Sequence, residues 1–89
     1  MSTFVFDVRV MLKPSVNDPQ GLSIRNALRT LGFDGVQEVR AGKIITLTVS
    51  AEDEAAARTA VTRMSDKLLA NPVIETFEVS LSGSASPAL

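Results

Sequence analysis

The side chains that could act as nucleophiles, general bases or metal ligands are few in this 89-residue chain. Histidine and cysteine are both absent, which excludes cysteine–histidine and serine–histidine catalytic pairs and metal sites built on thiolate or imidazole. A cluster of carboxylates occurs at Glu52-Asp53-Glu54, directly before a helical pattern. Acidic residues there complement the positive end of a helix dipole, so we expect a helix start rather than a carboxylate metal site. No catalytic or metal-binding residue is therefore predicted on this chain.

Composition also limits the ligands and partners of the chain. No glycine-rich phosphate loop is present, so no bound nucleotide or other cofactor is expected. The net charge is −1 and the nine Lys and Arg residues form no basic run, which argues against a nucleic-acid partner. No apolar stretch is long enough to span a membrane, and the N-terminal residues lack the positive start of a signal peptide. Together with the absence of cysteine, these features predict a cytoplasmic protein without a membrane partner.

The first candidate site for partner binding is the stretch Asp18-Pro19-Gln20-Gly21. Asp18 is a favourable helix N-cap, and Pro19 suits the first helical position, where its missing N–H costs nothing. A simple helix cap accounts for these two residues but explains Gln20 and Gly21 less well. Glycine inside a first turn costs up to about 1 kcal/mol relative to alanine, so Gly21 indicates a close approach by another backbone. We attribute that approach to a partner chain and predict that all four residues contact a partner.

The second candidate site comprises Arg40, Gly42 and Lys43. The pattern predicts a tight hairpin turn between two strands, with the two cations at its tip. Two interpretations remain open, since the tip is either a solvated turn or a cationic surface that docks on a partner. Under the second interpretation, replacing Arg40 and Lys43 by alanine is expected to leave the fold intact and to weaken the assembly of a complex.

A third informative stretch runs from Lys67 to Glu75 and predicts a helix that passes into a strand with almost no loop. Lys67 lies near the negative end of the helix dipole. Asn71 tolerates the left-handed conformation that often follows a helix, and Pro72 prevents further helix. We expect a mainly structural role for this stretch, with Asn71 retained as a candidate partner contact.

Hydrophobic periodicity places these stretches on six elements of a single domain covering residues 1–81. Alternating apolar residues predict strands at Phe4–Leu12 and around Ile45–Val49, and a further strand is expected at Val73–Leu81. A strand is also expected at Phe33–Ala41, where Val36 and Val39 depart from strict alternation and would require a bulge. Helices are predicted from Pro19 to a C-cap at Gly32, and from Glu52 to Ala70 after a capping box formed by Ser50 and Asp53. Their apolar stripes are Ile24, Ala27, Leu28 and Leu31, and Ala57, Ala60, Val61, Met64 and Leu68. Residues 82–89 are expected to form a flexible tail.

The predicted order, β-α-β-β-α-β, favours an α+β fold of the ferredoxin-like type. We expect an antiparallel four-stranded sheet with both helices on one face. The other face would then be open, with a mixed row of side chains on its first strand: Val5, Asp7, Arg9 and Met11. A domain of this size is marginally stable alone, so we expect a dimer or tetramer that associates through the sheet.

The three stretches, in this order and at these separations, resemble the PurS family, the small subunit of phosphoribosylformylglycinamidine synthase. The resemblance extends from about Phe4 to Val79. It implies a non-catalytic subunit of an ATP-dependent, glutamine-hydrolysing ligase in de novo purine biosynthesis. Such a subunit bridges the glutaminase and synthetase subunits and assists the transfer of ammonia between them. ATP and magnesium are then expected on the synthetase subunit, and the partners are further copies of this chain and the two other subunits.

A function of a different class also fits the predicted element order. Small regulatory domains with the β-α-β-β-α-β layout bind an amino acid at a dimer interface, and fold alone cannot separate the two functions. A regulatory domain should be stabilised against unfolding by its ligand, whereas an assembly subunit should not.

Overall fold

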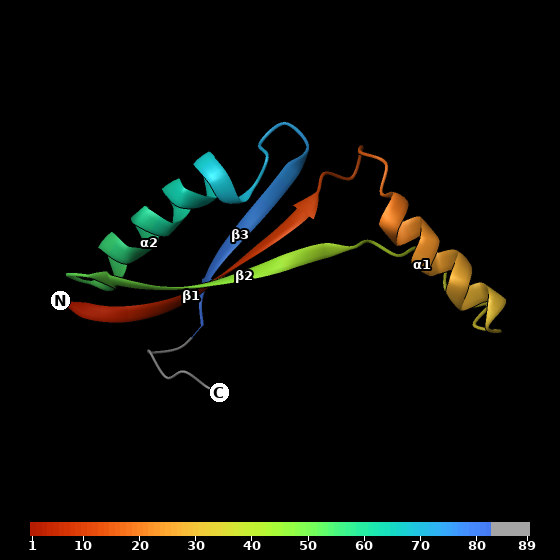
Figure 1. Cartoon of the computed structure of the whole chain (residues 1–89), viewed down its shortest axis with the longest axis horizontal. Helices are drawn as coiled ribbons and strands as arrows, with labels where there is room; N and C mark the ends of the chain where they lie inside the picture. The colour runs from red at the N-terminus through yellow and green to blue at the C-terminus, as the bar shows by residue number, and fades with distance from the viewer. Residues whose placement is uncertain (83–89) are drawn as a thin grey trace.

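The computed structural model describes residues 1–82 of the chain and consists of three strands and two helices around one sheet (Figure 1). In chain order the elements are β1 (Ser2–Leu12), α1 (Pro19–Thr30), β2 (Gly42–Ala51), α2 (Glu54–Met64), a π-helical turn (Ser65–Leu69) and β3 (Glu75–Leu81). The tail expected at 82–89 lies outside the described residues from position 83 onward.

The sheet is antiparallel and has the strand order β2-β1-β3, so the N-terminal strand lies in its centre. Val8 pairs with Ile45 of β2 and with Val79 of β3, which sets the register on both sides. Because side chains alternate between the two faces of a sheet, the even-numbered apolar residues of β1 all lie on one face. That inner face is covered by α2 (Figure 1).

The hydrophobic core forms between the inner face and α2. Phe6, Val8 and Val10 of β1 are fully buried, or nearly so, and α2 packs onto them with Ala57 and Val61. Complete burial of one Phe or Val side chain stabilises the fold by roughly 1.5–3 kcal/mol. The apolar residues of the two outer strands pack against this core but remain half-buried: Ile45, Leu47, Val49, Phe77, Val79 and Leu81.

The predicted strand at Phe33–Ala41 does not form, and the expected four-stranded sheet is wrong for the described residues, where the sheet has three strands. Residues 33–41 instead contain a turn followed by irregular backbone. Val36 and Val39 are three residues apart, so they cannot share one face of a strand, and Gly35 contributes no side chain that would favour one.

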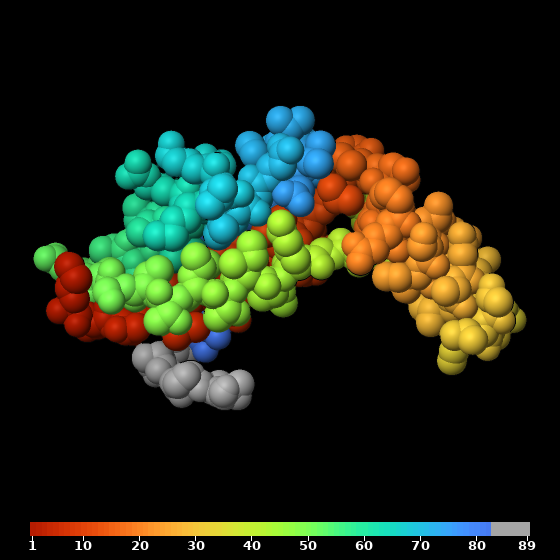
Figure 2. Space-filling model, in the orientation of Figure 1, coloured from red at the N-terminus to blue at the C-terminus, as the bar shows by residue number. Residues whose placement is uncertain are grey.

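The expectation of two helices on one face is also wrong, because α1 projects away from the sheet (Figures 1 and 2). We call residues 19–39 the arm. The radius of gyration is 16.5 Å, whereas a compact domain of this length would have about 12 Å. The stripe predicted to bury α1 is consequently accessible: Ile24 is 39% exposed and Leu31 72%, and Phe33 just beyond the helix is 58% exposed.

The second helix begins and ends differently from the prediction. Ser50 belongs to β2, and the N-cap is Asp53, whose carboxylate accepts a hydrogen bond from the Ala56 N–H at 2.8 Å. At the other end, the π-helical turn changes which leucine faces the core. Leu69 packs against the core, whereas Leu68, predicted to be buried, is 82% exposed.

Candidate functional site

The three stretches singled out from the sequence meet where the arm joins the sheet. Asp18, the N-cap of α1, lies at the centre of this junction and is only 8% exposed. One carboxylate oxygen accepts a hydrogen bond from the Gly21 N–H at 2.9 Å, and the other accepts one from the Ala41 N–H, also at 2.9 Å. A single side chain therefore caps α1 and holds the chain where it returns to the sheet.

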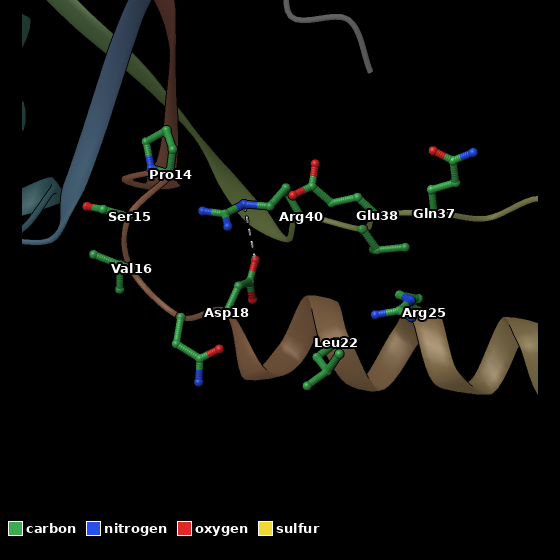
Figure 3. Close-up of a pocket in the computed structure, with 11 residues that line it drawn as sticks. Pro14, Ser15, Val16, Asp18, Leu22, Arg25, Gln37, Glu38 and Arg40 are labelled. Carbon is green, nitrogen blue, oxygen red and sulfur yellow. Dashed lines mark ion pairs between the residues drawn. The ribbon is translucent and has the colours of Figure 1, made fainter.

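The charge of Asp18 is stabilised by its surroundings. The hydrogen bond from the Gly21 N–H lowers the pKa of this carboxyl below its ordinary value, and the bond from Ala41 acts in the same direction. Burial opposes this shift, while the nearby Arg40 guanidinium adds to it, with 3.9 Å between Arg40 Nε and Asp18 Oδ2 (Figure 3). Asp18 is thus an ionised structural group whose acceptor oxygens are both in use.

Arg40 is a second component of the junction, not the tip of a solvated hairpin. Its Nη2 donates hydrogen bonds to the carbonyl oxygens of Leu12 at 3.1 Å and Lys13 at 3.0 Å, at the end of β1. The expectation that Arg40 has no folding role is therefore wrong, because the guanidinium links the end of β1, Asp18 and the start of β2. We refer to Asp18 and Arg40 together as the joint.

Gly21 and Gly42 are required by close packing within this chain. A Cβ atom on Gly21 would meet the carbonyl oxygen of Val39. The close backbone approach predicted at Gly21 is thus real, but the approaching backbone is the returning segment of the same chain and not a partner chain. At Gly42 a Cβ would meet the sulfur of Met11 and lie 2.6 Å from the carbonyl oxygen of Val10.

Asn71 belongs to the turn that leads into β3. Its side-chain oxygen accepts a hydrogen bond from the Val73 N–H at 3.0 Å, and its own N–H donates to the Glu75 carboxylate at 2.7 Å. This turn reaches the junction through the adjacent backbone, because the Lys13 N–H donates to the carbonyl of Ile74 at 2.8 Å. Asn71 therefore has a local structural role, while a contact with a partner remains a proposal.

Three cavities border the joint, and they differ in the candidate residues that they contain. The smallest, of about 250 Å³, is lined by Arg40, Gly42 and Lys43 among others. A cavity of about 320 Å³ brings together most of the predicted partner-binding residues, since Asp18, Pro19, Gln20, Gly42 and Lys43 all line it. Glu75 also lines this cavity. Sequence reasoning did not select Glu75 as a site residue, although it ends the third stretch. The other three candidates, Gly21, Arg40 and Asn71, are not among the lining residues of this cavity.

The largest of the three cavities, of about 450 Å³, lies between the loop after β1, the first turns of α1 and residues 37–40 (Figure 3). Arg25, Glu38 and Arg40 contribute charged side chains to its wall. The Nε atom of Arg25 is buried and has no hydrogen-bond partner in the described part of the chain. Sequence reasoning missed Arg25, because no local pattern distinguishes it from other polar residues of a helix.

The junction has the chemistry of a structural contact surface. Each oxygen of its central carboxylate accepts a hydrogen bond, and the Arg40 guanidinium donates to two backbone carbonyls. Within residues 1–82, no group of three or more acidic side chains lies close enough to hold a metal ion. Over the same residues, no helix is both long and apolar enough to cross a membrane.

Comparison with known proteins gives a consistent family. Residues 5–83 match the family model described as PurS, phosphoribosylformylglycinamidine (FGAM) synthase. The phosphoribosylformylglycinamidine synthase subunit PurS of Synechocystis is 48% identical over 83 residues, which cover 90% of this chain and 83% of the relative. The corresponding subunit of Bacillus subtilis is 44% identical over 79% of this chain and 82% of its own length.

Solved structures agree with the sequence relatives. A chain of the PurLQS structure from Thermotoga maritima superposes with a TM-score of 0.85 at 37% identity, covering 91% of this chain and 99% of that one. PurS of Methanocaldococcus jannaschii gives a TM-score of 0.79 at 38% identity, with 89% and 95% covered. These matches favour the enzyme-subunit function over the regulatory ligand-binding domain. The chain belongs to the PurS family and is a subunit of phosphoribosylformylglycinamidine synthase, an enzyme of purine biosynthesis.

Proposed function

We propose that this chain is the non-catalytic assembly subunit of its synthase, bridging the glutaminase and the ATP-dependent synthetase and assisting the transfer of ammonia. The observation that carries this proposal is the junction. Its acidic centre, Asp18, is fully engaged in capping α1 and holding Ala41, and Arg40 is engaged with backbone carbonyls. The junction therefore positions the arm and leaves chemistry to the other subunits, with ATP and magnesium bound by the synthetase.

The arm supports association with a second copy of the chain. Ile24, Leu31 and Phe33 expose apolar surface along it, and removing such surface from water favours association by roughly 25 cal/mol per Å². The inner face of the sheet offers a complementary place, because only α2 covers it and Ile45 and Leu47 on β2 are half-buried. We propose a homodimer in which each arm packs on the partner's sheet, beside α2, where a second helix of a ferredoxin-like sandwich would lie.

The free edge of β2 adds a second route of association. β2 pairs only with β1, so over the described residues its outer edge has unpaired backbone groups. The partner's segment 33–41, which forms no strand in the isolated chain, could complete a fourth strand there. Exchange of the arm would thus restore the four-stranded sheet and the second helix between two chains, and dimers could pair further into a tetramer.

The bridging surfaces that we propose are the candidate residues around the 320 Å³ cavity, together with Asn71. Gln20 and Lys43 are exposed there, and within the described residues neither side chain has a hydrogen bond to another group. Assembly would take place in the cytoplasm, in keeping with the absence of cysteine.

Co-elution of the purified chain with the glutaminase and synthetase subunits of the same organism, with glutamine and Mg-ATP present, tests this function. We expect one species that contains all three proteins. Sedimentation of the chain alone should give a dimer or tetramer, and the Leu31→Asp variant should shift it toward the monomer. A wild-type chain that stays monomeric at micromolar concentration, or that elutes apart from both subunits, would refute the proposal.

A further inference from the structure

An exposed apolar stripe lies on α2 and the π-helical turn, away from the junction and its cavities. Ala60, Met64 and Leu68 line a shallow hollow of about 400 Å³ together with Arg63 and Lys67. Leu68 is 82% exposed and Met64 39% exposed. No part of the fold described above uses this stripe.

The π-helical turn is what brings Leu68 to the surface. In a regular α-helix, Leu68 would lie about three turns after Ala57 and therefore on the same buried face. Instead, the Ala70 N–H donates to the carbonyl of Ser65, five residues earlier, at 2.9 Å, and the Ser65 hydroxyl donates to the Val61 carbonyl at 2.8 Å. The wider turn lets Leu69 pack on the core and leaves Leu68 outside. Short π-helical segments often occur at functional sites.

The charged residues of the hollow are cations only. Arg63 and Lys67 line it, and no acidic residue does. Within residues 1–82, neither side chain forms an ion pair or a side-chain hydrogen bond. An apolar stripe with a row of unpaired cations beside it is complementary to an amphipathic helix that carries carboxylates next to its apolar face.

The charges of the chain argue against a second copy as the occupant. The exposed helix of that copy would be α1, whose charged residues are Arg25 and Arg29, with no acidic residue between Pro19 and Thr30. Placing α1 on the hollow would set these arginines against Arg63 and Lys67, and like charges that face each other disfavour association.

We propose that this hollow docks an acidic amphipathic helix of another subunit of the synthase. The apolar face of that helix would cover Met64 and Leu68, and its carboxylates would pair with Arg63 and Lys67. This inference rests on the proposed assembly function and adds to it the surface used and the chemistry of the partner.

Calorimetric titration of the full chain into the purified synthetase and, separately, the glutaminase subunit tests the hollow. Leu68→Ser and Lys67→Glu should each weaken binding to one of the two subunits by about tenfold or more, as expected for a central contact. The matched controls are Val73→Ser, since Val73 is 76% exposed, and Arg9→Glu, since the Arg9 side chain is 60% exposed on the open face of the sheet. Both controls should bind as the wild type does. Added salt should weaken the wild type more than Lys67→Glu.

The possible outcomes separate this inference from the proposed function. If the wild type binds and both hollow variants bind equally well, the hollow is not the docking site, although the assembly function stands. If the hollow variants lose self-association in sedimentation, the occupant is a second copy and the inference is wrong. If the wild type binds neither subunit, the assembly function itself fails, and this inference fails with it.

Discussion

Because Gly21 packs against the returning segment, we predict that replacing it by alanine destabilises the protein. At an ordinary helical position, replacing glycine by alanine stabilises a protein by up to about 1 kcal/mol, because alanine has the higher helix propensity. In this protein the added Cβ would meet the carbonyl oxygen of Val39 and lie 3.0 Å from Asp18 Oδ2. The obstructing atoms include backbone, which cannot move aside as a flexible side chain does.

The expected magnitude follows from these opposing effects. Overpacking in a close contact costs about 1–3 kcal/mol, and the gain in helix propensity offsets up to about 1 kcal/mol of it. Gly21→Ala should therefore lower the free energy of unfolding by about 1 kcal/mol, which corresponds to about 4–8 °C in Tm for a domain of this size. The helix would be pushed away from the returning segment, which weakens the 2.9 Å bond from Ala41 to Asp18.

Thermal and urea unfolding at a fixed protein concentration would measure the change in stability, since association also affects Tm. Amide hydrogen exchange would report the local effect, because the Ala41 N–H should exchange faster in the variant. Gly35→Ala is the matched control: a Cβ at Gly35 meets nothing within 4 Å, and its effect should stay within about 0.5 kcal/mol. A stabilised Gly21→Ala variant with unchanged exchange at Ala41 would refute the assigned contact.

Two further predictions concern the caps of the helices. The pKa of Asp18 is lowered in the folded chain, so below about pH 4 the unfolded chain binds more protons and stability falls as pH decreases. Asp18→Asn should be less stable than the wild type at neutral pH, and acid titration of unfolding should show a smaller loss of stability below pH 4 for the variant. An unchanged acid dependence would contradict the role of Asp18. For α2, Asp53→Ala should cost about 1 kcal/mol by loss of the cap, whereas Ser50→Ala should change stability by less than about 0.5 kcal/mol. Urea unfolding measures both losses of stability. A larger loss for Ser50→Ala than for Asp53→Ala would support the capping box predicted from the sequence.

The parts of the fold that the sequence predicts well are those specified by local periodicity. β1 alternates over its whole length, β2 alternates from Ile45 to Val49, and α2 carries a helical stripe, so each is found close to its predicted place. The helix start at Asp18 and Pro19 is equally local, because a cap involves only neighbouring residues.

The features that sequence reasoning missed depend on contacts between distant parts of the chain. Residues 33–41 form no strand although the outer edge of β2 is free, because most of this segment belongs to the arm, which projects away from the sheet. The position of α1 is set by hydrogen bonds from the Ala41 N–H to Asp18 and from Arg40 to the Leu12 carbonyl, across 23 and 28 residues. The exposure of Leu68 depends on a single π-helical turn. The helical periodicity of the whole segment does not reveal such a local change in the number of residues per turn.

The structure shows how the candidate partner-binding residues are arranged, while their contacts with a partner stay a prediction. Asp18, Pro19, Gln20, Gly42 and Lys43 belong to two separate stretches of the sequence, and the fold brings them together around one cavity. Gly21 packs against the returning segment of its own chain and Arg40 bonds to the end of β1, while the contacts of both residues with a partner stay a prediction. The residue type indicates that a position makes a specific contact. Only the three-dimensional structure shows which group it contacts.

The most direct test of the assembly function is product formation by the reconstituted enzyme with glutamine or with ammonium as the nitrogen source, in the presence and absence of this chain. We predict that omitting the chain abolishes glutamine-dependent formation of phosphoribosylformylglycinamidine but leaves the ammonium-dependent reaction of the synthetase in place. Equal glutamine-dependent rates with and without the chain would contradict the account.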